Sequence, residues 1–113
     1  MTSDTFRRLA LTMPETLEVG HMGHPDFRVG GKIFATLGYP DERWGMVKLT
    51  PEQQEAFVAA DPAVYAPVHG GWGQRGATNV LLRRARVASL RTALMAAWRN
   101  VAPAKLAKQV EVS

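Results

Sequence analysis

Hydrophobic and polar residues alternate along much of the segment from Gly23 to Leu49, and this alternation predicts β-strands joined by tight turns. Gly30 and Gly31 suit a two-residue hairpin turn because glycine readily adopts a positive φ. The polar residues 40–43 suit a second turn. We therefore expect three consecutive antiparallel strands, over residues 27–29, 32–39 and 44–49.

The second of these strands has the clearest period of two, so its two faces can be assigned from the sequence. The residues expected on the core face are Ile33, Ala35, Leu37 and Tyr39. The residues expected on the opposite face are Lys32, Phe34, Thr36 and Gly38. Both faces carry apolar side chains, so the second face also needs a cover.

Apolar residues recur with a helical period on both sides of the strands. A first helix is expected from an N-cap at Ser3 to about Thr12, because Pro14 disfavours helical backbone at the residue before it. Its apolar face comprises Phe6, Leu9, Ala10 and Met13. Residues 16–22 alternate only weakly and predict a short strand.

Thr50 and Gln53 have the spacing of a capping box, and Pro51 suits the first helical position between them. They predict a second helix that runs to about Ala60 and buries Phe57 with Ala56 and Ala60. The glycine- and proline-rich residues 62–76 predict a long structured loop, with a short helical turn over 63–65. Loops of this length often carry function.

The remaining pattern predicts a strand over 77–82 and the longest helix over 87–102, ended by Pro103. The apolar stripe of this helix comprises Val87, Leu90, Leu94, Ala97, Trp98 and Val101. Residues 105–113 predict a basic terminal turn that frays. We expect a single α+β domain over 1–113, with an antiparallel meander covered on one face by the first and last helices.

Composition excludes some chemistry and points to one class of partner. The chain has no cysteine, which excludes disulfides, thiolate catalysis and zinc–thiolate sites. It has neither an apolar run long enough for a signal peptide nor one for a membrane span, so a cytoplasmic location is expected. Residues 62–110 hold arginines and lysines but no acid, whereas acids outnumber bases in residues 1–61. This asymmetry, with a net charge of +4, favours a polyanionic partner.

Several of these segments resemble the MmcQ/YjbR family of small bacterial proteins. The resemblance covers nearly the whole chain and is most specific in HPDFRVGGKIFATL at 24–37 and in Trp72 with Asn79-Val80 downstream. It implies an α+β fold similar to that of frataxin and CyaY, and the DNA-binding label that many members carry. It does not imply the iron binding of frataxin, which depends on an acidic ridge, because Arg7 and Arg8 follow Asp4 in the first helix.

The resemblance and the charge asymmetry together predict DNA binding through basic residues on strands and turns, with an exposed aromatic that stacks on bases. The candidate contacts are Arg28, Lys32, Lys48, Trp72, Arg75, Arg83, Arg84 and Arg86. The alternative for the basic residues is that they are ordinary surface charges, and for Trp72 that it is a core residue closing the long loop. A second functional hypothesis is a small-molecule- or protein-binding module, with Tyr65, His69 and Trp72 walling a pocket against the sheet.

Other chemistry has weaker support. His21, His24 and His69, with Asp26, could ligate a divalent metal, but their spacing matches no known ligand pattern, and we expect no metal or cofactor. Residues 71–76 match G-x-G-x-x-G, but a strand follows the motif and no acid lies about 20 residues on, so a dinucleotide site is not expected. The sequence contains no catalytic signature, and we expect no enzyme.

Overall fold

A computed structural model describes residues 1–20 and 24–112. Strands run at Leu17–Val19 (β1), Asp26–Val29 (β2), Lys32–Leu37 (β3), Trp44–Lys48 (β4), Tyr65–Pro67 (β5) and Ala77–Leu81 (β6). Helices run at Ser3–Leu11 (α1), Pro51–Ala60 (α2), Gly71–Gln74 (α3), Val87–Val101 (α4) and Ala104–Val112 (α5), with a 3₁₀ turn at Leu82–Arg84 (η1). The chain is thus α+β, as expected.

The strands form one antiparallel sheet in the order β1-β2-β3-β4-β6-β5. The predicted meander is confirmed as β2, β3 and β4, and the predicted late strand as β6. Gly30 and Gly31 both have positive φ, 58° and 79°, as the predicted primed turn requires. The sheet ends on each side in a strand of three residues, β1 and β5.

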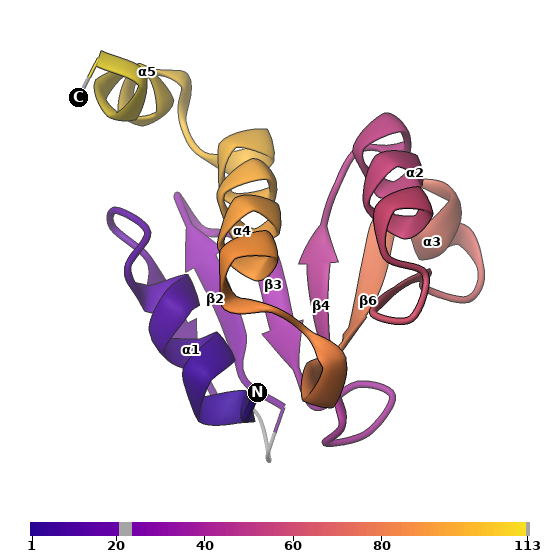
Figure 1. The fold of residues 1–113 in the computed structure, drawn as a ribbon. Helices are drawn as coiled ribbons and strands as arrows, with labels where there is room; N and C mark the ends of the chain where they lie inside the picture. Colours follow the sequence, from indigo (N-terminus) through magenta and orange to yellow (C-terminus); the bar gives the residue numbers. More distant parts are fainter. Residues whose placement is uncertain (21–23, 113) are drawn as a thin grey trace.

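Helices α1, α2 and α4 lie on the same face of the sheet (Figure 1). The core lies between these helices and the sheet, as predicted for the helices over residues 3–12 and 87–102. Its sheet residues are Phe27, Val29, Phe34, Ala35, Leu37, Val47, Tyr65 and Val80. Its residues from α1 and α4 are Phe6, Leu9, Ala10, Leu90, Ala93, Leu94, Ala97 and Trp98. Trp98 is fully buried and donates from Nε1 to the carbonyl oxygen of Pro14, at 3.0 Å.

The prediction that Phe34 faces away from the core is wrong. The register between β2 and β3 shifts at Phe27/Arg28, where the pairs Phe27–Ala35 and Arg28–Ile33 leave Phe34 as the additional residue. Such a bulge interrupts the alternation of side chains. Phe34 consequently joins the core with no exposed surface, while Ile33 is only half-buried.

Tyr39 does not lie in the core either. β3 ends at Leu37, and Gly38 has a φ of 90°, which turns the chain out of the strand. Tyr39 is 60% exposed, and its ring contacts that of His24, with the centroids 4.5 Å apart. The aromatic residue that the alternation assigned to the core therefore lies at the surface.

The helix ends follow the sequence closely. The capping box of Thr50 and Gln53 is confirmed, but α1 is capped by the Thr2 side chain rather than by Ser3.

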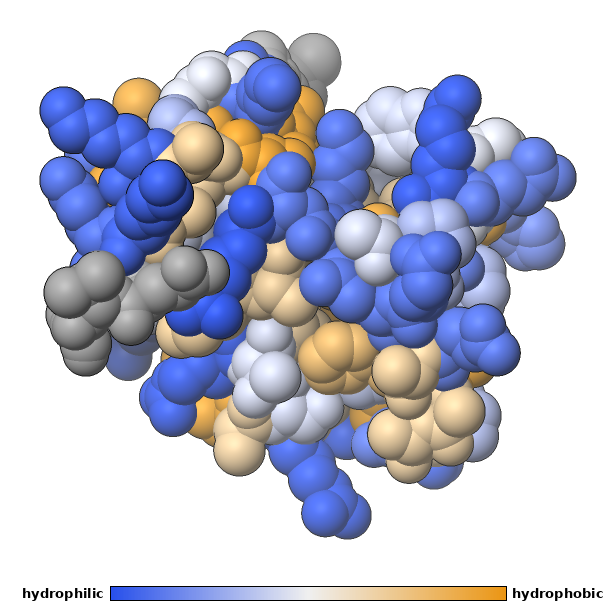
Figure 2. Space-filling model, turned by 90° about the horizontal axis from the view of Figure 1, so that it is seen from above, coloured by the Kyte–Doolittle hydropathy of each residue, from blue (hydrophilic) through white to orange (hydrophobic). Residues whose placement is uncertain are grey.

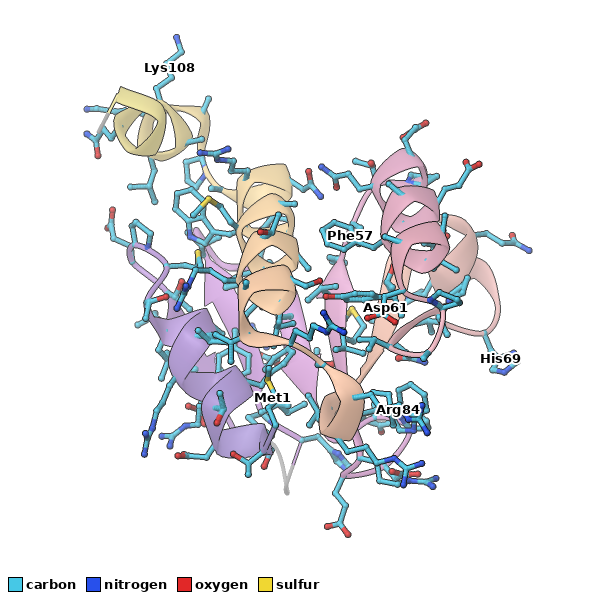
Figure 3. The ribbon with its side chains drawn as sticks, in the orientation of Figure 1. Met1, Phe57, Asp61, His69, Arg84 and Lys108 are labelled. Atoms are coloured by element: carbon cyan, nitrogen blue, oxygen red, sulfur yellow. The ribbon has the colours of Figure 1, made fainter. Side chains whose placement is uncertain are left out.

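The burial of α2 differs from the prediction. Phe57 packs on Tyr65 with ring centroids 5.2 Å apart, whereas Ala56 and Ala60 are exposed, contrary to prediction. The side chain of Phe57 points toward α4 in Figure 3. Val87 is also exposed, since it begins α4 beyond the edge of the core.

The segment 62–76 is more regular than predicted. The predicted helical turn is confirmed before β5, where the Asp61 carbonyl oxygen accepts from the N–H groups of Val64 at 3.1 Å and Tyr65 at 3.0 Å. The segment also contains β5, which pairs with β6, and the short helix α3, neither of which was predicted. Residues 104–112 are helical, and Leu106 and Ala107 of α5 pack against the core.

The end of the sheet at which β4 finishes faces the viewer in Figure 2, where hydrophilic residues predominate. Within the described residues, no helix combines the length and apolar character needed to cross a membrane.

Candidate functional site

A row of cross-strand neighbours runs over the sheet face opposite α1 and α4. Asp26 pairs with Thr36, Thr36 with Met46, and Met46 with Asn79, so all four side chains share one face. Met46 is buried but does not belong to the core on the helical side. This row is the floor of a cavity of about 560 Å³.

The walls of the cavity come from three chain segments. His24, Tyr39 and Pro40 line one wall, and Val68, His69 and Trp72 line the other. His24 and Tyr39 belong to segments on either side of the β2–β3 hairpin, and their ring contact holds that wall together. The cavity is therefore built largely from apolar and aromatic side chains, with a few polar groups on its floor, which is the usual composition of a small-molecule site.

The charged group on the floor, Asp26, is only 6% exposed and is paired with Arg28. Arg28 donates from Nε to Oδ1 at 2.8 Å and from Nη2 to Oδ2 at 3.1 Å. These side-chain hydrogen bonds raise the pKa of Arg28 above its ordinary value. Two residues apart on one strand, the two side chains lie on the same face, so the carboxylate at the cavity is neutralised locally.

The turn that carries Pro40 is closed by Asp41 and Arg43. The Asp41 carboxylate accepts hydrogen bonds from Arg43 Nε at 3.0 Å, Nη2 at 2.8 Å and the backbone N–H at 2.9 Å. The side-chain bonds, followed by the backbone bond, lower the pKa of Asp41 to about 2. The turn next to the cavity wall is thus held by an ionised carboxylate.

A pH titration of the Asp41 carboxyl ¹³C resonance is expected to have its midpoint near pH 2. The pKa is depressed in the folded state, so the stabilisation is present above the unfolded value of about 3.9 and is lost as the pH falls toward 2. Arg43→Ala removes the side-chain bonds but keeps the backbone N–H, so it should raise the midpoint toward the unfolded value of about 3.9 without reaching it. Arg8→Ala, on α1, should leave the midpoint unchanged. A midpoint near 3.9 in the unaltered protein would contradict this assignment.

The opposite wall is fixed by backbone contacts around α3. Gln54 donates from Nε2 to the carbonyl oxygens of Gly73 at 3.0 Å and Ala77 at 2.9 Å, which ties α2 to this segment. A Cβ on Gly73 would lie 1.6 Å from the carbonyl oxygen of Val68, so only glycine fits there. These contacts hold Trp72 in place although its side chain is 53% exposed. Trp72 is therefore no core residue.

A second hollow of about 440 Å³ adjoins the cavity at Trp72, which lines both. Its other lining residues include Lys48, Thr50, Arg75 and Asn100. The ammonium of Lys48 lies over the indole of Trp72, 5.9 Å from the ring centroid, as in a cation–π contact. Asn100 Nδ2 donates to the carbonyl oxygen of Lys48 at 3.0 Å and to Gln53 Oε1 at 2.7 Å, which joins the C-terminal end of α4 to this hollow.

The predicted DNA contacts fall into two groups at opposite ends of the sheet. Lys32 begins β3, Lys48 ends β4 and Ala77 begins β6. All three lie at one end of the sheet, because Val29 at the end of β2 pairs with Lys32, and Lys48 pairs with Ala77. Arg83 and Arg84 follow the other end of β6, and the exposed Arg86 caps α4 beyond them. Arg84 and Lys108 lie at opposite ends of the molecule in Figure 3. The eight candidates therefore do not share one surface.

The end with Lys32 and Lys48 also contains Trp72 and Arg75, and it is the better candidate for a common interface. Lys32 and Arg75 are exposed, whereas Arg28 is only partly exposed and is bound to Asp26. The turn at Gly30 lies against Pro103, at the junction of α4 and α5. The hairpin tip is thus partly packed rather than free on all sides.

The histidines and Tyr65 do not come together as the sequence suggested. His24 and His69 line opposite walls of the cavity, and His69 points outward in Figure 3. His21 lies outside the described residues, and the described ones contain no cluster of three side chains that would hold a metal ion. Tyr65 faces the core, where its hydroxyl is 2.7 Å from that of Ser89 and burial raises its pKa.

The sequence predicted only part of one wall of the cavity and none of its floor. His69 and Trp72 were predicted for a pocket, but Thr36, Met46 and Asn79 were not. The signal was present for Thr36, which the period of two placed on the face opposite the core. Met46 is aligned with Thr36 by the register between β3 and β4, which the alternation alone does not give. Asn79 could not be aligned with them without the pairing of β4 with β6, which are separated in the chain by α2, β5 and α3.

A family model described as YjbR matches residues 11–100. Among solved structures, the fold is similar to the crystal structure of Deinococcus radiodurans protein DR2400, which carries the domain DUF419. The TM-score is 0.74 at 20% sequence identity, over 97% of this chain and 88% of that one. No curated protein matched the sequence.

Proposed function

This chain belongs to the YjbR family, and within that fold we propose that it binds a small, mainly apolar molecule on the sheet face opposite α1 and α4. The observation that carries the proposal is the cavity of about 560 Å³ between the floor of the sheet and the segment that holds Trp72. Its size falls within the range of roughly 300–1,000 Å³ that is usual for ligand pockets.

The composition of the cavity supports the same function. Met46, Val68 and Pro40 offer apolar contact, and the rings of Tyr39 and Trp72 offer flat surfaces against which an aromatic ligand would pack. Thr36 and Asn79 supply hydroxyl and amide groups on the floor that would fix the orientation of a ligand. Asp26 is engaged by Arg28, so we propose binding without catalysis.

Thr36→Phe is expected to weaken binding of the neutral fluorophore N-phenyl-1-naphthylamine at least about tenfold, or about 1.4 kcal/mol. The added ring would occupy the cavity from its floor, where Thr36 is half-buried. The measurement is a fluorescence titration. Thr36→Val, which has nearly the shape of threonine, should retain binding. A wild-type protein that does not bind the probe, or a Thr36→Phe variant that binds it equally well, would contradict the proposal.

Nucleic-acid binding is a second candidate, supported by the group formed by Lys48, Trp72 and Arg75. The Lys48 ammonium lies over the half-exposed indole, and Arg75 lines the same hollow, an arrangement that suits a phosphate backbone with stacked bases. Lys32 lies at the same end of the sheet and would extend this surface. Affinity from such contacts would fall steeply with salt.

Titration with single-stranded and duplex DNA at about 50 and 200 mM salt tests this candidate. We expect binding at the lower concentration, a steep loss at the higher, and weaker single-strand binding in Trp72→Leu because stacking is lost. Arg83→Met, at the opposite end of the sheet, is the control and should have little effect. Absence of binding at about 50 mM salt would exclude DNA as the partner.

A further inference from the structure

The second hollow carries positive charge without a carboxylate to balance it. Lys48 and Arg75 both line it, and its lining includes no acidic residue. Among the side chains of residues 1–20 and 24–109, the ion pairs involve Arg7, Arg8, Arg28 and Arg43, but neither Lys48 nor Arg75. The two cations are thus available to an anion from outside the chain.

The hollow and the cavity are adjacent parts of one surface. Lys48 lies two residues beyond Met46 on β4, so its side chain emerges on the same face as the cavity floor, roughly 7 Å further along the strand. Trp72 lines both spaces, and its indole lies against the Lys48 ammonium. A molecule that fills the cavity and passes the indole would reach the hollow that Lys48 and Arg75 line.

The charges differ between the two spaces. In the cavity the carboxylate of Asp26 is bound by Arg28, so that part favours an apolar group. In the hollow the cations are unbalanced, and an anionic group would receive charge-assisted hydrogen bonds there. The combined site is therefore apolar at one end and cationic at the other.

We propose that the ligand is an amphipathic anion. Its aromatic or aliphatic body would occupy the cavity, and its carboxylate, sulfonate or phosphate would bind Lys48 and Arg75 beyond the edge of Trp72. This inference rests on the proposed small-molecule function and specifies the ligand class. The cation–π contact with Trp72 keeps the Lys48 ammonium at the junction of the two spaces, where it meets the anionic group.

Two fluorophores with the same aromatic body test this inference. 8-Anilinonaphthalene-1-sulfonate carries the anionic group, and N-phenyl-1-naphthylamine lacks it. We expect the wild-type protein to bind the sulfonate about tenfold more tightly than the neutral probe. Lys48→Met and Arg75→Met should each weaken the sulfonate about fivefold and leave the neutral probe unchanged, because methionine keeps the apolar contact but removes the charge.

Two control variants separate the possible outcomes. Arg83→Met, at the other end of the sheet, should alter neither affinity, and Thr36→Phe should weaken both probes because the body of each needs the cavity. Equal wild-type affinities, insensitivity to Lys48→Met and Arg75→Met, or sulfonate binding that survives Thr36→Phe would overturn the anionic class while the neutral probe still reports the pocket. Failure of the wild-type protein to bind either probe would overturn the proposed function as well.

Discussion

Gly73→Ala is expected to lower the free energy of unfolding by on the order of 3 kcal/mol and to abolish binding of N-phenyl-1-naphthylamine. A Cβ at this position would lie 1.6 Å from the Val68 carbonyl oxygen and 2.7 Å from the carbonyl carbon. Backbone atoms on both sides would have to separate, and this would also strain the hydrogen bond from Gln54 to the Gly73 carbonyl. Because Val68 and Trp72 line the cavity wall, the displacement would alter the site directly.

The matched control for this substitution is Gly71→Ala in the same short helix. There the nearest atom to a new Cβ is Arg75 Nη2 at 3.6 Å, an ordinary contact. Urea unfolding followed by circular dichroism gives the stability of each variant, and the fluorescence titration gives its affinity. If Gly73→Ala were as stable as Gly71→Ala and bound the probe equally well, the close packing of Gly73 on Val68 would not position Trp72.

Trp98→Ala is expected to cost about 3–5 kcal/mol, a large part of the roughly 5–15 kcal/mol that stabilises a domain of this size. Trp98 has no exposed surface, and its side chain points from α4 into the core that also contains Phe6 and Phe27. Its removal would leave a cavity and also the Pro14 carbonyl without the indole N–H that it accepts. Pro14 precedes β1, so the first strand would lose one of its anchors to α4.

Urea unfolding measures this loss, and Arg99→Ala, at the next position of the same helix, is the control. Arg99 is exposed, and its truncation should stay within about 0.5 kcal/mol of the wild type. If Trp98→Ala does not fold, Trp98→Phe supplies an intermediate case that keeps an aromatic ring but loses the hydrogen bond to Pro14. A cost for Trp98→Phe no larger than that for Arg99→Ala would contradict the structural role of this side chain.

The order of the main elements follows from local sequence. Thr50 with Gln53 set the start of α2, and the Gly30-Gly31 turn set the β2–β3 hairpin, because each depends on hydrogen bonds and torsion angles within a few residues. Phe34 and Tyr39 were misassigned because a register shift and a positive φ at Gly38 break the alternation that the prediction assumed. Such local departures have no periodic signature.

The site was less predictable than the fold because its parts lie far apart in the chain. The cavity floor needs the pairing of Thr36 with Met46 and of Met46 with Asn79, and the second of these pairs spans α2, β5 and α3. Charge alone placed Arg83 and Arg75 in one set, yet Arg75 precedes β6 and Arg83 follows it, so the length of this strand separates them to opposite ends of the sheet. Composition thus identified the kinds of residue involved but not their grouping.

The short strands at the two sides of the sheet have a consequence for self-association. β1 and β5 each offer only three residues to an incoming strand, and β5 finishes at Pro67, which has no N–H to donate. Short edges and edge prolines discourage a second molecule from extending a sheet by backbone pairing. The sheet is thereby protected against growth into fibrillar aggregates, even though one of its faces is given over to a cavity rather than to helices.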